Sequence, residues 1–325
     1  RCRMRITARR AAIVYALIVA FIAGVGFFVA SLMLNGAEWA SNKANRHIYS
    51  GGTIVNAGTI YDINGKALAK SSDNERVFAE NSTVRKSVLH IVGDTAGRIS
   101  TGTHYLYRDV LSGYSRIEGI YNLKQTGVGT DIKLNIDSEA NKIAYNALGD
   151  YDGAVAVYNY KTGQLLCSVS KPAYDIENAP DDLLTNEKYD GVFLDKVISG
   201  IYTPGSIIKI ITAACAIENI PDIYTRTFDC DGEYETDDGT VICNGVHGKV
   251  NFQKAMNESC NCAFAEISIE LGASKLEATA KSMGFNSQLY AKEIRLTKSR
   301  FSPSAKSKSE LGWAGIGQST TYVNP

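Results

Sequence analysis

The most pronounced pattern along the chain is an almost uninterrupted run of apolar residues from Ala11 to Leu34. As a helix, this run is long enough to cross the ~30 Å hydrocarbon core of a membrane, and it exceeds the roughly 7 to 15 apolar residues of a signal peptide. Five arginines crowd the ten residues before it, and Trp39 follows it. The positive-inside rule therefore predicts a single-pass anchor in the cell membrane, with a cytoplasmic N-terminus and the rest of the chain exported. The alternative is a signal peptide that is cleaved between residues 37 and 40.

The pattern changes again near residue 130. Residues 35–130 are polar, rich in tyrosine and glycine, and broken into short segments, which is typical of a small, irregular, mostly β module. More regular periodicity follows, and 325 residues are enough for more than one domain. We therefore expect four parts, which are a basic cytoplasmic tail (1–10), the membrane anchor (11–34), a stalk module (35–130) and a main domain (131–325).

The first part of the main domain shows one helical and two strand-like patterns. Asp137 can cap a helix that ends at Gly149, and the spacing predicts its apolar stripe to be Ala140, Ile143, Ala144, Ala147 and Leu148. Two strand-like runs at 154–158 and 165–170 then flank the sequence KTG at 161–163. This arrangement predicts a β-hairpin with glycine in its turn.

Two further helices are expected downstream. The segment after Gly205 is apolar on nearly all sides, which predicts a helix buried in the middle of the domain. A second helix is expected from about Ala263 to Leu271, where Gly272 ends it. The fold class is therefore α+β, with an antiparallel sheet flanked by helices, placed after a transmembrane helix and the small stalk.

Charge and cysteine content narrow the choice of ligands. The 34 basic residues equal the 34 acidic ones, so no net field attracts nucleic acid, and we expect no nucleic-acid partner. An exported domain can form disulfides, and Cys230 and Cys243 bracket a loop that such a bond would suit, although the sequence leaves this open. Cys230, Cys243 and His247 also resemble part of a zinc site. Because Cys260-x-Cys262 lacks the usual two-to-four-residue gap between ligands, we expect no metal and no cofactor.

Candidate chemistry begins at residues 203–209, which read TPGSIIK. Pro204 and Gly205 place Ser206 in the first turn of the apolar helix, where free N–H groups can stabilise an oxyanion. Lys209 lies one turn later on the same face and is the one charge among the apolar residues there. Burial lowers a lysine pKa, so a neutral amine could act as the base for the serine nucleophile. The plain alternative is an ordinary helix-capping serine followed by a surface lysine.

A second motif favours the catalytic interpretation. Ser259-Cys260-Asn261 lies some fifty residues downstream, at the start of the next helix. With it the chain resembles the class B penicillin-binding proteins of bacteria, whose motif order is S-x-x-K, S-x-N and K-[ST]-G. Further segments that resemble this family, in the same order as in the family, are 62–69, 134–137, 153–155, 161–164, 170–175, 202–206, 243–248, 259–264 and 315–318.

The resemblance implies the penicillin-binding transpeptidase fold and a D,D-transpeptidase of peptidoglycan synthesis. Ser206 would attack the penultimate D-Ala of a stem peptide ending in D-Ala-D-Ala, and Lys209 would take its proton. Ser259 would protonate the leaving D-Ala, and Asn261 would hold Lys209 and the substrate. The expected partners are stem peptides, β-lactams that acylate Ser206, and other membrane proteins of cell-wall synthesis. The alternative is a penicillin-binding sensor or an inactive structural partner.

The chain departs from the family pattern in two places. KTG at 161–163 precedes the serine and lies in a turn, whereas the family has K-[ST]-G on a strand after S-x-N, so we expect a chain that is incomplete at its C-terminus. The activity of such a fragment by itself stays open. Ala57 also stands where the family usually has arginine before Gly58, which affects the contacts of the stalk and not the chemistry.

Overall fold

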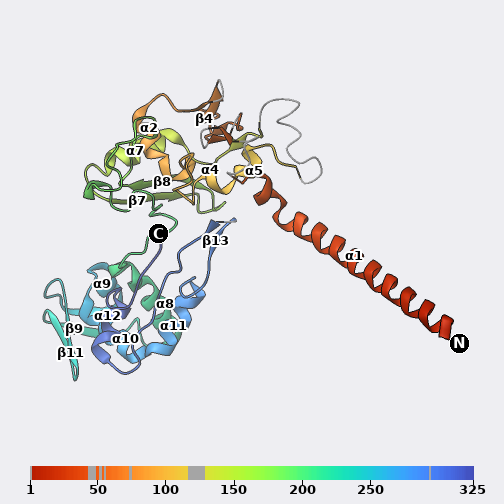
Figure 1. Ribbon diagram of the computed structural model, residues 1–325. Coiled ribbons are helices and arrows are strands. Elements are labelled where there is room, and N and C mark those ends of the chain that lie inside the picture. The colour runs from red at the N-terminus through yellow and green to blue at the C-terminus, as the bar shows by residue number, and fades with distance from the viewer. Residues whose placement is uncertain are drawn as a thin grey trace. The chain divides into compact units, whose positions relative to one another are not determined.

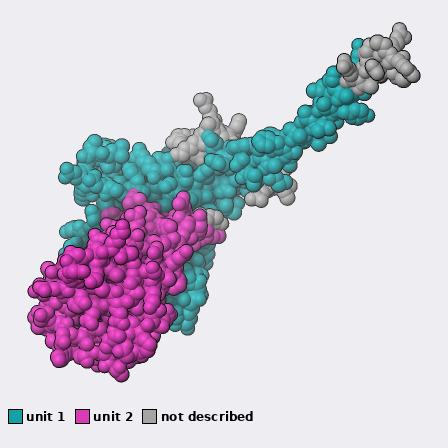
Figure 2. Space-filling model, turned by 90° about the horizontal axis from the view of Figure 1, so that it is seen from below, with its two compact units in different colours: residues 1–193 teal, residues 194–325 magenta. Residues whose placement is uncertain are grey.

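The structure is a computed structural model that describes residues 2–42, 49–50, 53–54, 56–72, 75–115, 129–292 and 294–325. It forms two compact units, residues 1–193 and 194–325 (Figures 1 and 2). Each unit has hydrophobic cores of its own.

Unit 1 combines a long N-terminal helix with short strands and helices. Its helices are α1 (Cys2–Ala40), α2 (Ser82–Ser87), α3 (Leu89–Val92), α4 (Thr103–Leu106), α5 (Arg108–Leu111) and α7 (Ser138–Ala147), with 3₁₀ turns η1 (Ile176–Asn178) and η2 (Glu187–Tyr189). Its strands are β1 (Tyr49–Ser50), β2 (Thr53–Ile54), β3 (Ile60–Tyr61), β4 (Ala67–Ser72), β5 (Glu75–Phe78), β6 (Ile132–Lys133), β7 (Gly153–Tyr158) and β8 (Leu165–Lys171). The predicted stalk thus contains short helices as well as strands.

Helix α1 contains the predicted anchor. Among the described residues it is the one helix that is long and apolar enough to cross a membrane, with a mean hydropathy of 2.6 over an 18-residue window between Arg10 and Ala40. Its apolar side chains, from Ile13 to Leu34, are exposed. An exposed apolar surface of this length is stable in a lipid environment and costly in water.

A four-stranded sheet organises the part of unit 1 that follows α1 along the chain. The strand order is β5-β4-β3-β6, with β3 and β6 parallel and the other pairs antiparallel. Its core is formed by small and branched residues from the sheet and the helices, among them Ile60, Leu68 and Val84.

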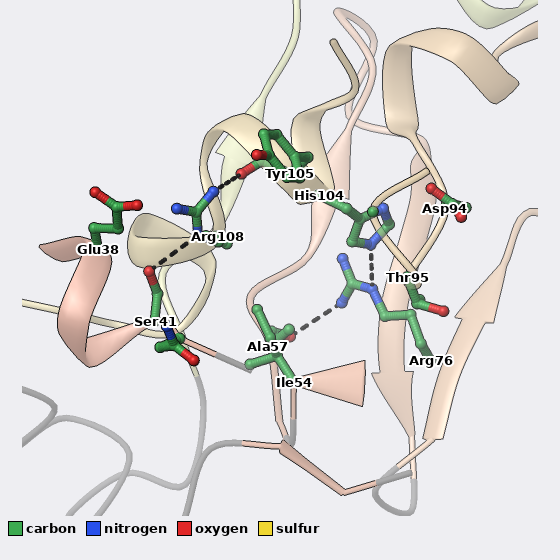
Figure 3. Close-up of a pocket in the computed structure, with 12 residues that line it drawn as sticks. Glu38, Ser41, Ile54, Ala57, Arg76, Asp94, Thr95, His104, Tyr105 and Arg108 are labelled. Atoms are coloured by element: carbon green, nitrogen blue, oxygen red, sulfur yellow. Dashed lines mark hydrogen bonds between the residues drawn. The ribbon is translucent and has the colours of Figure 1, made fainter. Parts of the chain in front are cut away.

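Strand β5 of this sheet carries a buried arginine (Figure 3). Arg76 donates from Nε to His104 Nε2 at 2.9 Å and from Nη1 to the carbonyl of Ala57 at 3.1 Å. Burial, together with the charge of Arg76, lowers the pKa of His104 to about 3. His104 is therefore neutral, and its Nδ1–H donates to the carbonyls of Val92 and Gly93 at 2.9 and 3.0 Å. Ala57 stands where the family usually has arginine, and its backbone carbonyl accepts a hydrogen bond from the guanidinium of Arg76.

The hairpin and helix predicted between residues 137 and 171 are confirmed. The side chain of Asp137 accepts from the N–H groups of Glu139 and Ala140, and Gly149 follows α7 with a φ of 54°. Strands β7 and β8 pair antiparallel around a turn in which Gly163 has a φ of 73°. The sequence KTG at 161–163 belongs to this turn.

The predicted apolar stripe of α7 is wrong in part, because Ala140, Ala144 and Leu148 are half-buried and the other two residues are not. Ile143 is 69% exposed and Ala147 is exposed, whereas Ser138 and Asn141 are fully buried. The Asn141 amide donates to the carbonyls of Ser87 and Ser168 at 3.2 and 2.9 Å and accepts from the Ser168 N–H at 3.1 Å. Helix α7 therefore attaches to α2 and β8 in part by satisfying the backbone groups of Ser87 and Ser168.

Unit 2 is a helical cluster with three two-stranded antiparallel sheets, β10-β11, β12-β9 and β13-β14 (Figure 1). Its elements are η3 (Gly205–Ile208), α8 (Lys209–Asn219), β9 (Thr227–Cys230), β10 (Glu233–Thr236), β11 (Gly239–Ile242), β12 (Gly248–Asn251), α9 (Phe252–Asn257), α10 (Asn261–Leu271), α11 (Ala273–Ser282), β13 (Tyr290–Ala291), β14 (Ile294–Arg295) and α12 (Lys308–Gly315). Helix α10 ends at Gly272, as predicted, and is buried along most of its length.

The expectation that the helix after Gly205 is buried on all sides is wrong in part. One face of η3 and α8 packs into the core through Ile208, Ile211 and Cys215. On the other face, Ile207, Ile210 and Ile217 are 60%, 57% and 47% exposed. A sequence that is apolar all round does not reveal which face finds a partner.

The two faces of α7 lead to a stability test. We expect Asn141→Ala to lower the free energy of unfolding by about 3 kcal/mol, because it leaves three buried backbone groups without partners. Ile143→Ala on the same helix should change it by less than about 0.5 kcal/mol, because that side chain is largely exposed. Chemical denaturation in detergent, followed by circular dichroism, measures both. Equal losses in the two variants, or a larger loss for Ile143→Ala, would contradict this account of how α7 packs.

Candidate active site

The four residues predicted for the site converge on one buried amine. Lys209 is 1% exposed, and its Nζ lies 2.8 Å from Ser259 Oγ, 2.7 Å from Asn261 Oδ1 and 3.4 Å from Ser206 Oγ. It also contacts the carbonyl oxygen of Ser259 at 2.6 Å. The face of the Phe264 ring lies 5.7 Å away. The amine therefore links the S-x-x-K turn to the S-x-N turn.

Burial decides the protonation of this lysine. It lowers the pKa of Lys209, and the nearby Cys243 and Cys260 oppose the shift without cancelling it. A lysine with a lowered pKa is more readily neutral, and a neutral amine has a lone pair that can accept a proton. Two serine hydroxyls lie within reach of that lone pair, and a hydroxyl can both donate and accept.

Ser206 is held at the start of a helix. It is exposed, in contrast to Lys209, and it lies in η3, which continues directly into α8. Pro204 occupies the N-cap position, and no side chain caps this helix start among the described residues. The first N–H groups of a helix have no partner within it, so they remain available to an anionic oxygen.

The S-x-N turn connects α9 to α10. Ser259 adopts a φ of 54°, in the left-handed region that is uncommon for residues other than glycine. Asn261 begins α10, and its Nδ2 donates to the carbonyl of Ile242 at 2.9 Å while its Oδ1 faces Lys209. Hydrogen bonds at both Nδ2 and Oδ1 thus fix the orientation of the Asn261 amide.

Sequence reasoning assigned no role to the two glycines of the segment Gly315-Ile316-Gly317, although a Gly-x-Gly repeat signals close backbone approach. The Gly205 N–H donates to the carbonyl of Gly317 at 2.9 Å, directly before Ser206. A Cβ at Gly317 would lie 1.9 Å from the carbonyl oxygen of Gly205, and one at Gly315 would lie 1.8 Å from Ser268 Oγ. Gly317 is therefore a positioning residue for the segment that carries Ser206.

The remaining candidates have other surroundings. The sequence KTG at 161–163 lies in the exposed β7–β8 turn of unit 1. Cys167, Cys215, Cys230, Cys243, Cys260 and Cys262 are all free thiols, so the disulfide between Cys230 and Cys243 that the sequence left open is not present in the structure.

A cavity in unit 1 offers a second place for a ligand (Figure 3). It has a volume of about 290 Å³ and is lined by Arg76, Arg108, Glu38 and Asp94 among others. The lining residues include no serine or cysteine beside a base comparable to the pair Ser206 and Lys209. The chemistry therefore points to unit 2.

Comparison with known proteins gives a consistent result. A family model described as the penicillin binding protein transpeptidase domain matches residues 153–325, which is more than half of the chain. The peptidoglycan D,D-transpeptidase PbpA of Mycolicibacterium smegmatis is 28% identical over 217 residues, which are 61% of this chain and 44% of that protein. The chain thus spans less than half the length of this relative.

Two solved structures are similar in fold. Penicillin-binding protein A from M. tuberculosis, in its penicillin G acyl-enzyme complex, is 23% identical with a TM-score of 0.71, over 83% of this chain and 68% of that chain. The penicillin-binding protein PBP2 from Helicobacter pylori, in complex with MreC, is 14% identical with a TM-score of 0.68, over 83% of this chain and 74% of that chain. At these identities the likeness concerns the fold.

The lowered pKa of Lys209 gives a pH dependence of stability with a definite sign. In the unfolded chain this lysine titrates near ~10.4, so between the folded pKa and that value the unfolded state binds more protons. The free energy of unfolding therefore rises with pH across this interval. We therefore expect the free energy of unfolding of the parent, minus that of Lys209→Met, to increase with pH between the folded and unfolded pKa values of Lys209. Denaturation at several pH values measures it. A difference that is constant or falls with pH would contradict the lowered pKa.

Proposed function

The chain belongs to the penicillin-binding protein transpeptidase family, in its class B branch, and on this premise we propose that it is a serine D,D-transpeptidase that cross-links peptidoglycan. The observation that carries the proposal is the buried Lys209 amine, which lies within 3.4 Å of Ser206 Oγ, Ser259 Oγ and Asn261 Oδ1. The named activity of PbpA, the M. smegmatis relative, supports the same reaction.

In the proposed acylation step, Ser206 Oγ attacks the carbonyl carbon of the penultimate D-Ala of a stem peptide ending in D-Ala-D-Ala. The hydroxyl proton passes to neutral Lys209, which the pKa lowering favours. The negative charge that develops on the carbonyl oxygen is stabilised by the N–H of Ser206 at the uncapped helix start.

The second half of acylation expels D-Ala. Its nitrogen needs a proton, and Ser259 Oγ supplies one while Lys209, 2.8 Å away, returns the proton taken from Ser206. Asn261 keeps the amine in place through its Oδ1 and contacts the substrate amide. The amine of a neighbouring stem peptide then attacks the acyl-enzyme, which releases Ser206 and forms the cross-link.

Location and partners follow from the same proposal. The five arginines before the apolar part of α1 support a cytoplasmic N-terminus, a single membrane span and an exported catalytic domain. The proposed cross-linking reaction then takes place on the exported side. We include other membrane proteins of this synthesis among the partners, with the H. pylori complex of PBP2 with MreC as support from a protein of the same fold.

We also propose that the transpeptidase domain begins near residue 131, as the sequence predicts, and not at residue 153, where the family model begins. The support is the attachment of α7 to the β7–β8 hairpin. The N–H of Asp137 donates to the carbonyl of Leu166 at 2.8 Å, and Asn141 makes two hydrogen bonds to Ser168. A boundary at 153 would separate these groups.

The decisive experiment is the intact mass of the protein after incubation with benzylpenicillin, expressed from its complete reading frame. We expect one added benzylpenicillin on the parent, because the strained lactam opens without losing a fragment. Ser206→Ala should gain none, and Ser302→Ala, which changes an exposed serine of the same unit, should gain one. No adduct on a folded parent would overturn the proposal.

An adduct alone does not separate an enzyme from a sensor. A donor peptide ending in D-Ala-D-Ala and an acceptor amine are therefore added in a second assay. Release of D-Ala with formation of the cross-linked product supports the transpeptidase. A stable adduct with no turnover favours the sensor.

The close approach of Gly317 to Gly205 leads to a further prediction. A side chain at Gly317 forces the backbone before Ser206 to move, because the contact at 1.9 Å is with a backbone oxygen. We expect Gly317→Ala to slow penicillin acylation by about 100-fold, in line with the effect of a small misplacement of a reacting group. Gly153→Ala is the control, because its Cβ meets its nearest neighbour, Leu148, at 3.9 Å. Equal acylation rates for Gly317→Ala and Gly153→Ala would show that Gly317 does not position Ser206.

A further inference from the structure

Four potential metal ligands meet directly behind the S-x-N turn. Cys230 ends β9, Cys243 follows β11, His247 precedes β12, and Cys260 is the N-cap of α10. Their ligand atoms all lie within 4.8 Å of one another. The three cysteines are buried, at 1%, 8% and 0% exposure, and His247 is half-buried.

The distances fit a tetrahedral site. Zinc bonds of about 2.3 Å to sulfur and about 2.05 Å to nitrogen imply a sulfur-to-nitrogen separation of roughly 3.6 Å in a regular tetrahedron. His247 Nδ1 lies 3.3 Å from Cys230 Sγ and 3.5 Å from Cys243 Sγ. A disulfide would draw two of the sulfurs to about 2.05 Å and leave the third cysteine and the histidine without a role.

The surroundings stabilise negative charge on the sulfurs. The N–H of Asn261 donates to Cys243 Sγ at 3.1 Å, which places this sulfur at the positive end of α10, a helix of 11 residues. Such contacts to the ligands from outside the site orient them and are typical of metal centres.

We propose that Cys230, Cys243, Cys260 and His247 bind one Zn²⁺ ion. Three thiolates and an imidazole in tetrahedral arrangement match zinc, and four protein ligands leave no open position, so the ion is structural and not catalytic. The proposal departs from the sequence-based expectation of no metal. That expectation treated Cys260-x-Cys262 as a ligand pair, whereas in the structure Cys260 joins Cys230, Cys243 and His247 as the fourth potential ligand.

A surface depression gives the ion a route to the site. It has a volume of about 620 Å³ and is lined by Cys230 together with Asp229, Asp231, Glu233 and Glu235. These four carboxylates are exposed and raise the local concentration of divalent cations.

The ion also bears on the proposed reaction, and this consequence rests on the proposed function. Cys260 is the middle residue of the S-x-N motif, between Ser259 and Asn261. Asn261 is in turn bonded to Cys243 Sγ and to the carbonyl of the preceding Ile242. A metal ion that binds both Cys243 and Cys260 therefore fixes the positions of Ser259 and Asn261, which contact Lys209. The metal site itself rests on its ligands alone and stands without the activity.

The test is the zinc content of the full chain, purified in detergent without chelators and measured by inductively coupled plasma mass spectrometry. We expect about one zinc per chain in the parent, as for a four-ligand structural site. Cys243→Ala and His247→Gln should retain less than about one tenth of it, because three ligands bind zinc far more weakly. Cys215→Ala, which removes a buried thiol in α8 outside the cluster, should retain the parent content.

If the variants do not fold, measurements on the parent protein still test the proposal. Replacement of zinc by Co²⁺ should give the visible absorption and sulfur-to-cobalt charge transfer of a tetrahedral thiolate site, and chelation should lower the melting temperature. A folded parent without zinc overturns the proposal, as does an intact mass two hydrogens lower, which indicates a disulfide. Because no step uses penicillin, a failure of the proposed activity leaves the metal result unaffected.

Discussion

The rest of unit 2 depends on the burial of the Lys209 amine. An ionisable group that is 1% exposed must find hydrogen-bond partners or lose its charge, and here it has such partners while burial lowers its pKa. Three oxygen acceptors from residues 259 and 261 lie within 2.8 Å of Nζ. These acceptors are some fifty residues away in sequence, so α8 and the turn between α9 and α10 must be held together accurately. The packing of α10 against α8 and α12 supplies that support.

The structure brings together the four residues that the sequence predicts for the site. The family resemblance supplied Ser259 and Asn261, whereas the pair Ser206 and Lys209 is local. Ser206 and Lys209 are one helical turn apart, and S-x-N is a short turn with a fixed place at the start of a helix. Helix ends were equally accessible, since Asp137, Gly149 and Gly272 act through their own backbone conformation or side chain. Each of these features needs only a few neighbouring residues, and the structure confirms the predicted helix ends.

The misassigned features all depend on contacts between distant segments. Periodicity placed Ile143 in the core, but the backbone groups of Ser87 and Ser168 needed partners, and Asn141 supplies them. The proposed metal ligands are also brought together by contacts between distant segments. Cys230 meets His247 because β9 pairs with β12 in the register Gly248 to Cys230, and no spacing rule for consecutive cysteines contains that pairing.

The three residues of the S-x-N motif can serve both the proposed metal site and the proposed active site, because its middle residue, Cys260, is the metal ligand. Ser259 and Asn261 direct polar atoms to Lys209, while the thiol between them lies in the cluster with Cys230 and Cys243. Ser259 holds a left-handed φ of 54°, a conformation that costs about 1 kcal/mol and persists only when its surroundings impose it. The proposed bond between Cys260 and the metal imposes this conformation on Ser259 and occupies no space on the substrate side. The side chain that the chemistry does not use is thus the one available to stabilise the turn.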